Sequence, residues 1–151
     1  MAIVEKNKLG KEVVVFSDCI RTNKKLSHPE RLAIIARSLD SIIEEYKPTA
    51  LSVETIFFEN NQKTAMLVAE ARGVILLSGS VKNIPVYEYS PLQIKVATTG
   101  DGRADKKQMI AMIPRLVSIL KEKMLDDEFD AIAIALTCLA SVRHKVPQLS
   151  P

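Results

Sequence analysis

The sequence predicts an α/β domain, and three observations support this fold class. At 151 residues, with 47% hydrophobic and 26% charged residues, the chain suits one domain with a sizeable core. Runs of β-branched and aromatic residues alternate with longer segments whose apolar residues recur every three or four positions. Residues typical of turns and helix caps separate these segments. Strands and amphipathic helices therefore follow one another along the chain.

Two short strands joined by a turn begin the chain. Residues 1–5 and 13–17 are rich in aliphatic and β-branched residues, as strands are. Between them, Asn7 and Gly10 favour a tight turn, because both residue types tolerate unusual backbone angles. We therefore expect a β-hairpin here.

The next segment carries the signals of a helix. Ser27 and Glu30 have the spacing of a capping box, and Pro29 is tolerated in a first helical turn. Lys47-Pro48 is expected to end the helix. The residues expected to form its apolar face are Leu32, Ile35, Leu39, Ile42, Ile43 and Tyr46.

A third strand is predicted from Leu51 to Phe57, and it contains one carboxylate, Glu54. Burying a carboxylate costs several kcal/mol unless it is paired, hydrogen-bonded or bound to a metal. Strand alternation could instead turn Glu54 towards water. Taken alone, the segment leaves both interpretations open.

A long helix is predicted from about Gln62 to Ser78. Ala65, Ala69 and Gly73 fall at four-residue steps, so they share one face of this helix. Such small residues allow another backbone to approach closely. Their spacing fits ordinary helix packing within the chain and also fits a dimer interface.

The following segments are shorter. Residues 84–89 read as a strand, residues 91–96 as a short helical turn with Lys95 near its end, and residues 98–103 as a loop. A helix is expected over residues 104–113, and Pro114 should kink or interrupt it.

An acidic segment precedes the last apolar run. Asp126, Asp127 and Glu128 suit the first turn of a helix, where carboxylates complement the helix dipole. Asp127 and Asp130, three positions apart, also lie on one helical face. The helix that follows is so apolar that it should be largely buried. Together with Glu54, the aspartates form an oxygen-rich, histidine-free set of the kind that Mg²⁺ or Mn²⁺ prefers.

The net charge and the two cysteines give limited information about function. A net charge of +3 is too small to indicate a nucleic-acid binder by itself. Cys19 and Cys138 lack metal-ligand spacing, so we expect buried thiols rather than a disulfide.

No apolar run is long enough to span a bilayer and no signal peptide is evident, so we expect a cytoplasmic protein. The tail after Ser141 mixes basic residues and prolines, and His144 there should be exposed.

The order and spacing of these segments resemble the RuvC-type Holliday junction resolvases. The similarity extends from Met1 to about Ser141, so residues 1–141 are expected to form a nuclease domain and residues 142–151 a flexible tail. No single motif carries it. The matching positions are Glu54-Thr-Ile-Phe57, Asn61, Ala65, Ala71-Arg-Gly73, Pro85-Val-Tyr-Glu-Tyr89, Lys95, Asp105-Lys106 and Asp127-x-x-Asp130-Ala-Ile-Ala-Ile-Ala.

The resemblance implies a ribonuclease-H-like fold, with a mixed sheet flanked by helices. It implies a structure-specific endonuclease that cuts four-way DNA junctions symmetrically during homologous recombination and DNA repair. Glu54, Asp127 and Asp130 match catalytic carboxylates that would hold two Mg²⁺ ions roughly 4 Å apart, with Mn²⁺ as a substitute for Mg²⁺. One ion would activate a water molecule and the other would stabilise the leaving oxygen.

The resemblance also implies contacts with DNA and with protein partners. Phe57 matches an aromatic position that would stack on an unpaired base at the junction crossover, although it would also suit a protein core. Lys95 and Lys106 match basic positions at the rim of the active site. The helix that carries Ala65 and Gly73 matches the homodimer interface, and a branch-migration helicase complex is the implied larger partner.

The sequence departs from this pattern at its beginning. The family opens with a strand and a Gly-Ile-Asp-Pro-Gly type turn whose Asp is a further metal ligand, whereas Met1-Ala-Ile-Val4 aligns with the second strand. We therefore expect that Met1 is an internal methionine or that the sequence is truncated.

Two alternative functions remain open at the level of the sequence. One is a junction-binding protein that lacks catalysis because the first ligand is absent. The other is an RuvX-type ribonuclease-H-like nuclease that acts on ribosomal RNA precursors.

Overall fold

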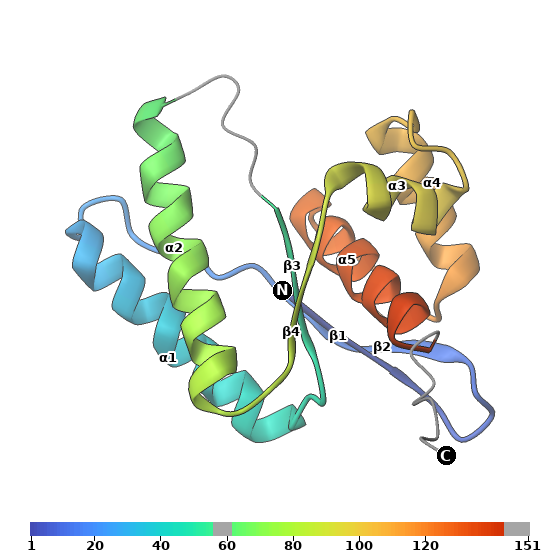
Figure 1. The fold of residues 1–151 in the computed structure, drawn as a ribbon, viewed down its shortest axis with the longest axis horizontal. Helices are drawn as coiled ribbons and strands as arrows, with labels where there is room; N and C mark the ends of the chain where they lie inside the picture. Colours follow the sequence, from blue (N-terminus) through green and yellow to red (C-terminus); the bar gives the residue numbers. More distant parts are fainter. Residues whose placement is uncertain (56–61, 144–151) are drawn as a thin grey trace, which may run out of the picture. The chain divides into compact units, whose positions relative to one another are not determined.

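The computed structural model describes residues 1–55 and 62–143, and it shows an α/β chain (Figure 1). The chain forms two compact units. Unit 1 comprises Met1–Asp18 and Tyr89–Pro151, and unit 2 comprises Cys19–Glu88. The elements are β1 (Ala2–Lys6), β2 (Glu12–Ser17), α1 (His28–Tyr46), β3 (Leu51–Glu54), α2 (Gln62–Val81), β4 (Val86–Tyr89), α3 (Pro91–Thr99), α4 (Lys106–Leu116) and α5 (Asp126–Arg143).

Strands β1 and β2 of unit 1 form the predicted hairpin. They pair antiparallel, and Asn7 organises the turn, since its Oδ1 accepts the N–H groups of Leu9 at 2.9 Å and Lys11 at 3.0 Å. The ladder is irregular at one point. Val4 pairs with Val14, but its neighbour Ile3 pairs with Phe16, so Val15 is an extra residue in a β-bulge.

Helix α5 forms the centre of unit 1. It packs against β1, β2, α3 and α4, and Figure 1 shows it between the hairpin and the two shorter helices. Ile132 and Ala133 are completely buried, as expected from the apolar sequence that follows Asp130. Cys138 is also buried, whereas Cys19 is half-buried. The two do not form a disulfide, as predicted, but the prediction that both are buried is correct only for Cys138.

Helices α3 and α4 differ from the sequence prediction. The short turn predicted over residues 91–96 is a nine-residue helix, α3, which ends at Thr99, and the next residue, Gly100, has a left-handed φ of 79°. Helix α4 continues through Pro114 to Leu116, so the predicted interruption is wrong. Pro114 lies in the last turn of α4, where the missing N–H removes a single hydrogen bond, and the Val117 N–H still bonds to the Ile113 carbonyl at 3.1 Å.

Unit 2 contains a pair of packed helices and the strands β3 and β4. Helix α1 begins as predicted, because Glu30 accepts hydrogen bonds from the Ser27 N–H at 2.7 Å and from the Ser27 hydroxyl at 2.6 Å. It ends at Tyr46, and the next residue, Lys47, has a left-handed φ of 45°. Helix α2 packs against α1 and extends three residues beyond the predicted end, to Val81. None of the helices in residues 1–55 and 62–143 has the length and apolarity to cross a membrane.

Two glycines of α2 have different surroundings. Gly79 is buried, and a Cβ atom there would lie 3.0 Å from Val86 Cγ2 and 3.4 Å from Leu51 Cδ1. Gly79 therefore allows α2 to approach β3 and β4 closely. Gly73 is exposed and a Cβ atom there would meet nothing within 4 Å.

Candidate active site

The predicted acidic pair lies on the first turns of α5 in unit 1. Asp127 and Asp130 are both exposed, as is Asp126 before them. The positive end of the helix dipole stabilises such carboxylates in water. The turn therefore presents several carboxylate oxygens to solvent.

Lys106 lies beside this acidic turn. It is the first residue of α4, whose start is fixed by Asp105, because the Asp105 side chain accepts the Gln108 N–H at 2.8 Å. The Lys106 Nζ atom is 3.2 Å from Asp130 Oδ2 and 3.7 Å from Asp126 Oδ2. The hydrogen bond to Asp130 raises the pKa of Lys106 and outweighs the opposing effect of desolvation, and the charges of the acidic turn add to the rise.

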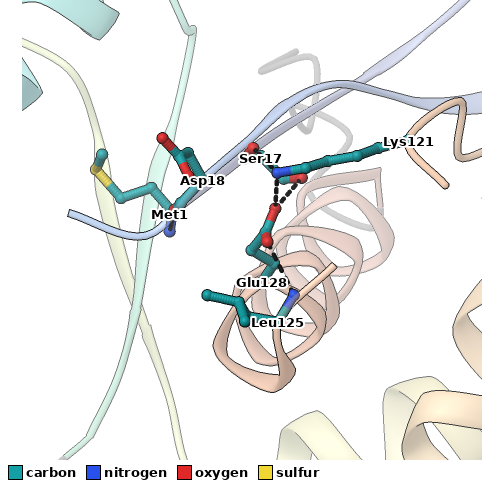
Figure 2. A network of polar contacts seen from close by, with 6 residues as sticks. All are labelled: Met1, Ser17, Asp18, Lys121, Leu125 and Glu128. Carbon is teal, nitrogen blue, oxygen red and sulfur yellow. Dashed lines mark hydrogen bonds and ion pairs between the residues drawn. The ribbon is translucent and has the colours of Figure 1, made fainter. Parts of the chain in front are cut away.

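A buried carboxylate anchors the same turn, as Figure 2 shows. Glu128 is only 2% exposed. Its Oε1 accepts hydrogen bonds from Ser17 Oγ at 2.7 Å and Lys121 Nζ at 2.6 Å, and its Oε2 accepts the Leu125 N–H at 2.9 Å. Both oxygens are thus satisfied, and they connect α5 to the end of β2 and to the segment before α5.

The pKa of Glu128 reflects these contacts. Burial by itself raises the pKa of this carboxyl group. Hydrogen bonds from the Leu125 N–H and from the Lys121 and Ser17 side chains outweigh burial and lower the pKa to about 2. Glu128 is therefore ionised at neutral pH, with Lys121 as its charge partner.

Sequence reasoning assigned Glu128 only to the helix dipole and did not identify Ser17 or Lys121. One signal was available, because Leu125 and Glu128 have the spacing at which a side chain reaches back to the N–H before a helix. The partners Ser17 and Lys121 are distant from each other in sequence, and no local pattern connects them.

Glu54 lies in unit 2, at the end of β3. It is exposed and follows the buried Val53, so strand alternation does turn its side chain outward. Arg72 of α2 fixes this end of the strand, because its Nε donates to the Glu54 carbonyl at 3.3 Å and its guanidinium forms an ion pair with Glu88 on β4. Arg72 belonged to a matched motif, but its contacts with Glu54 and Glu88 were not predicted.

Lys95 and Phe57 are the remaining residues of the predicted site. Lys95 lies on α3 and is half-buried. Phe57 lies outside the described residues. Among residues 1–55 and 62–143, no three Asp, Glu, His or Cys side chains gather into a metal site. The donor chemistry nevertheless fits a hard cation, since Glu54, Asp127 and Asp130 are exposed carboxylates.

Comparison with known proteins identifies the family. The family model for the crossover junction endodeoxyribonuclease RuvC matches residues 1–138. The chain belongs to the RuvC family. It is 39% identical over 142 residues to the RuvC of Fusobacterium nucleatum, covering 94% of this chain and 73% of that protein. It is 45% identical over 121 residues to the RuvC of Thermosipho melanesiensis, covering 80% of this chain and 76% of that protein.

Solved RuvC structures show the same fold. Thermus thermophilus RuvC matches 95% of this chain with a TM-score of 0.82 and 27% identity, over 86% of its own length. The T. thermophilus RuvC complex with a Holliday junction substrate matches with a TM-score of 0.85 and 28% identity, covering 95% of this chain and 87% of that one. The ribonuclease-H-like fold inferred from the sequence is therefore confirmed.

The family settles the class of activity. Its members are named crossover junction endodeoxyribonucleases, so this RuvC-family chain is a Holliday junction resolvase, a hydrolase of DNA phosphodiester bonds. Of the alternatives, the RuvX-type nuclease is disfavoured, because the matched family model and the relatives described here are RuvC proteins.

Proposed function

We propose that Glu54, Asp127 and Asp130 are the catalytic carboxylates of this resolvase and that they bind Mg²⁺, with Mn²⁺ as a substitute. The observation that supports this most is the acidic turn of α5. Asp127 and Asp130 are exposed on a turn that the buried Glu128 anchors, and Lys106 lies 3.2 Å from Asp130. A rigid turn with exposed carboxylates and an adjacent cation suits a site that receives a phosphodiester.

Each residue has a distinct part in the proposed chemistry. Divalent ions bound at the carboxylates would activate water and neutralise charge on the leaving oxygen. Lys106 and Lys95 would bind the scissile phosphate and its neighbours as point charges. Phe57 would stack on a base at the crossover. Residues 1–141 would supply this nuclease domain, with residues 142–151 as its tail.

We further propose that the chain acts as a homodimer through α2. Met66, Leu77 and Val81 are 68%, 62% and 71% exposed, although they are large apolar residues. Exposed apolar residues grouped on one helix favour a protein interface. Two identical active sites related by a two-fold axis would give symmetric cuts in a four-way junction.

The proposal includes the cellular setting that the family implies. The protein would act in the cytoplasm on junctions formed during recombination and repair. A branch-migration helicase complex would be its partner on the DNA.

Cleavage of a synthetic four-way junction tests the proposed function. The experiment compares the chain with and without Mg²⁺, the Glu54→Gln variant and a linear duplex substrate. We expect paired nicks that require Mg²⁺, that disappear in Glu54→Gln and that do not form on the linear duplex. Asp127→Asn and Asp130→Asn should have the same effect as Glu54→Gln.

Two outcomes would contradict parts of this proposal. Tight junction binding without any cleavage would indicate a junction-binding protein that lacks catalysis. Cleavage that persists in Glu54→Gln and Asp130→Asn would show that the catalytic carboxylates lie elsewhere.

A further inference from the structure

The ammonium group of Lys106 contacts two carboxylates of α5. Its Nζ atom is 3.2 Å from Asp130 Oδ2 and 3.7 Å from Asp126 Oδ2. Asp126 and Asp130 are four positions apart, so they share one face of the helix and both reach the same lysine. The carboxylate that we assign to the metal ion is thus paired with the lysine that we assign to the phosphate.

This arrangement creates a competition. A divalent cation bound at Asp130 and the ammonium group of Lys106 would repel each other if both contacted this carboxylate. Lys106 must therefore move away from Asp130 when the cation binds. Asp126 offers a second acceptor within reach, and its side chain is 69% exposed.

We propose that Lys106 is an internal counter-ion of the metal site, exchanged from Asp130 to Asp126 when a divalent cation binds. The inference rests on the proposed function and adds to it a coupling between the cation and the DNA. After the exchange, Lys106 would be paired only with the exposed Asp126, and its ammonium group at the rim would be available to a DNA phosphate. Asp126, which no matched motif contains, becomes a positioning residue for Lys106.

Mn²⁺ binding to the full chain without DNA tests the exchange. Electron paramagnetic resonance of free Mn²⁺ reports the affinity directly, independently of cleavage. Lys106→Met keeps the unbranched stem and removes the charge, so it should bind Mn²⁺ about three- to fivefold more tightly, which is the size expected for an exposed ion pair. Lys107→Met is the matched control, because Lys107 is an exposed lysine in the same helical turn. It should change the affinity less than about twofold.

A double-mutant cycle tests the role of Asp126. Asp126→Asn should weaken Mn²⁺ binding when Lys106 is present, because the lysine then has only Asp130 to pair with. The same change should have little effect in Lys106→Met. If Asp126→Asn weakens Mn²⁺ binding equally with Lys106 and with Lys106→Met, Asp126 acts only through its negative charge. That result would overturn its role in positioning Lys106.

Asp130→Asn separates failure of this inference from failure of the proposed function. If Asp130→Asn leaves Mn²⁺ binding unchanged, the assignment of Asp130 as a ligand is wrong and both proposals fall. If Asp130→Asn weakens Mn²⁺ binding while Lys106→Met and Lys107→Met behave alike, the ligand assignment stands and the counter-ion exchange is overturned. Circular dichroism of each variant verifies that the fold is retained.

Discussion

Arg72 shows how one side chain can position the end of the strand that carries Glu54. Its guanidinium connects the Glu54 carbonyl on β3 with the Glu88 carboxylate on β4. The planar guanidinium presents several N–H donors in a fixed arrangement, so it can hold both groups at once. Lysine carries a single ammonium point charge and cannot reproduce this geometry.

Arg72→Lys should therefore slow junction cleavage roughly tenfold, because a small displacement of Glu54, the proposed catalytic carboxylate, would be costly. The midpoint of thermal unfolding should change little, since the charge is retained. Single-turnover cleavage rates and a thermal melt measure the two effects. Glu88→Gln is the control, because it removes the ion pair and leaves the bond to Glu54. Wild-type cleavage by Arg72→Lys would show that the bond to the Glu54 carbonyl does not matter.

At this scale, the sequence points to candidate ligands more readily than to the residues that position them. Glu54, Asp127 and Asp130 stand out because carboxylates next to apolar segments need an explanation. Their assignment as ligands remains a prediction. Arg72 and Glu128 are ordinary charged residues in sequence, and their contacts arise only when distant segments pack together.

At the scale of elements, the first turn of α5 depends on a carboxylate that must stay ionised. The pKa of Glu128 is lowered to about 2 from its ordinary value of 4.5. Because the folded pKa lies below the unfolded one, the stabilisation is complete above about pH 4.5 and declines as the pH falls towards about 2.

Glu128→Gln should therefore be less stable than the wild type near neutral pH, and the difference should shrink in acid. Between about pH 6 and pH 3, the difference in the free energy of unfolding should fall by about 2 kcal/mol. Urea unfolding at both pH values, followed by circular dichroism, measures it. A difference that does not depend on pH would mean that packing rather than charge determines the effect of Glu128.

The two glycines of α2 provide a second test of an element. Alanine favours a helix over glycine by about 1 kcal/mol. Gly73→Ala should gain most of this, because nothing lies within 4 Å of the added Cβ atom. Gly79→Ala should gain much less, because its Cβ atom would be 3.0 Å from Val86 Cγ2. Urea unfolding of both variants measures the two free energies of unfolding. Equal gains would show that the Val86 side chain on β4 moves aside at little cost.

Helix starts were more predictable than helix ends. The capping pattern at Ser27 and Glu30 is local, and the structure confirms it. The effect of Pro114 depends on whether helical turns follow it, and here α4 ends at Leu116. A proline in a last turn costs little, and the sequence alone did not place that end.

At the scale of the whole molecule, the exposed apolar residues of α2 allow a direct test of the proposed homodimer. Leu77→Glu should weaken the dimer by at least tenfold, because a carboxylate buried in an interface lacks a partner. Sedimentation equilibrium measures the dissociation constant. Leu120→Glu is the matched control, since Leu120 is 86% exposed but lies outside α2. Equal dimerisation by both variants would exclude α2 as the interface.

The fold of the whole chain was predictable through the order of its segments. The alternation of strands and helices, with charged residues at fixed places along it, matched one family over residues 1–138. The register in which β1 and β2 pair was harder to predict from the sequence. The bulge at Val15 lies within a run of valines, where any register satisfies the hydrophobic pattern.

That bulge determines where the side chains of the hairpin point. In a regular strand, Val14 and Ser17 would face opposite sides, because they are three residues apart. At the bulge, Val15 and Phe16 both lie opposite Ile3, so the alternation of side chains shifts by one residue. Ser17 therefore faces the same side as Val14, where it bonds to Glu128. The number of residues in β2 is therefore more constrained than the identity of its apolar residues. Valine could be exchanged for isoleucine at position 15, but deleting that residue would turn Ser17 away from Glu128.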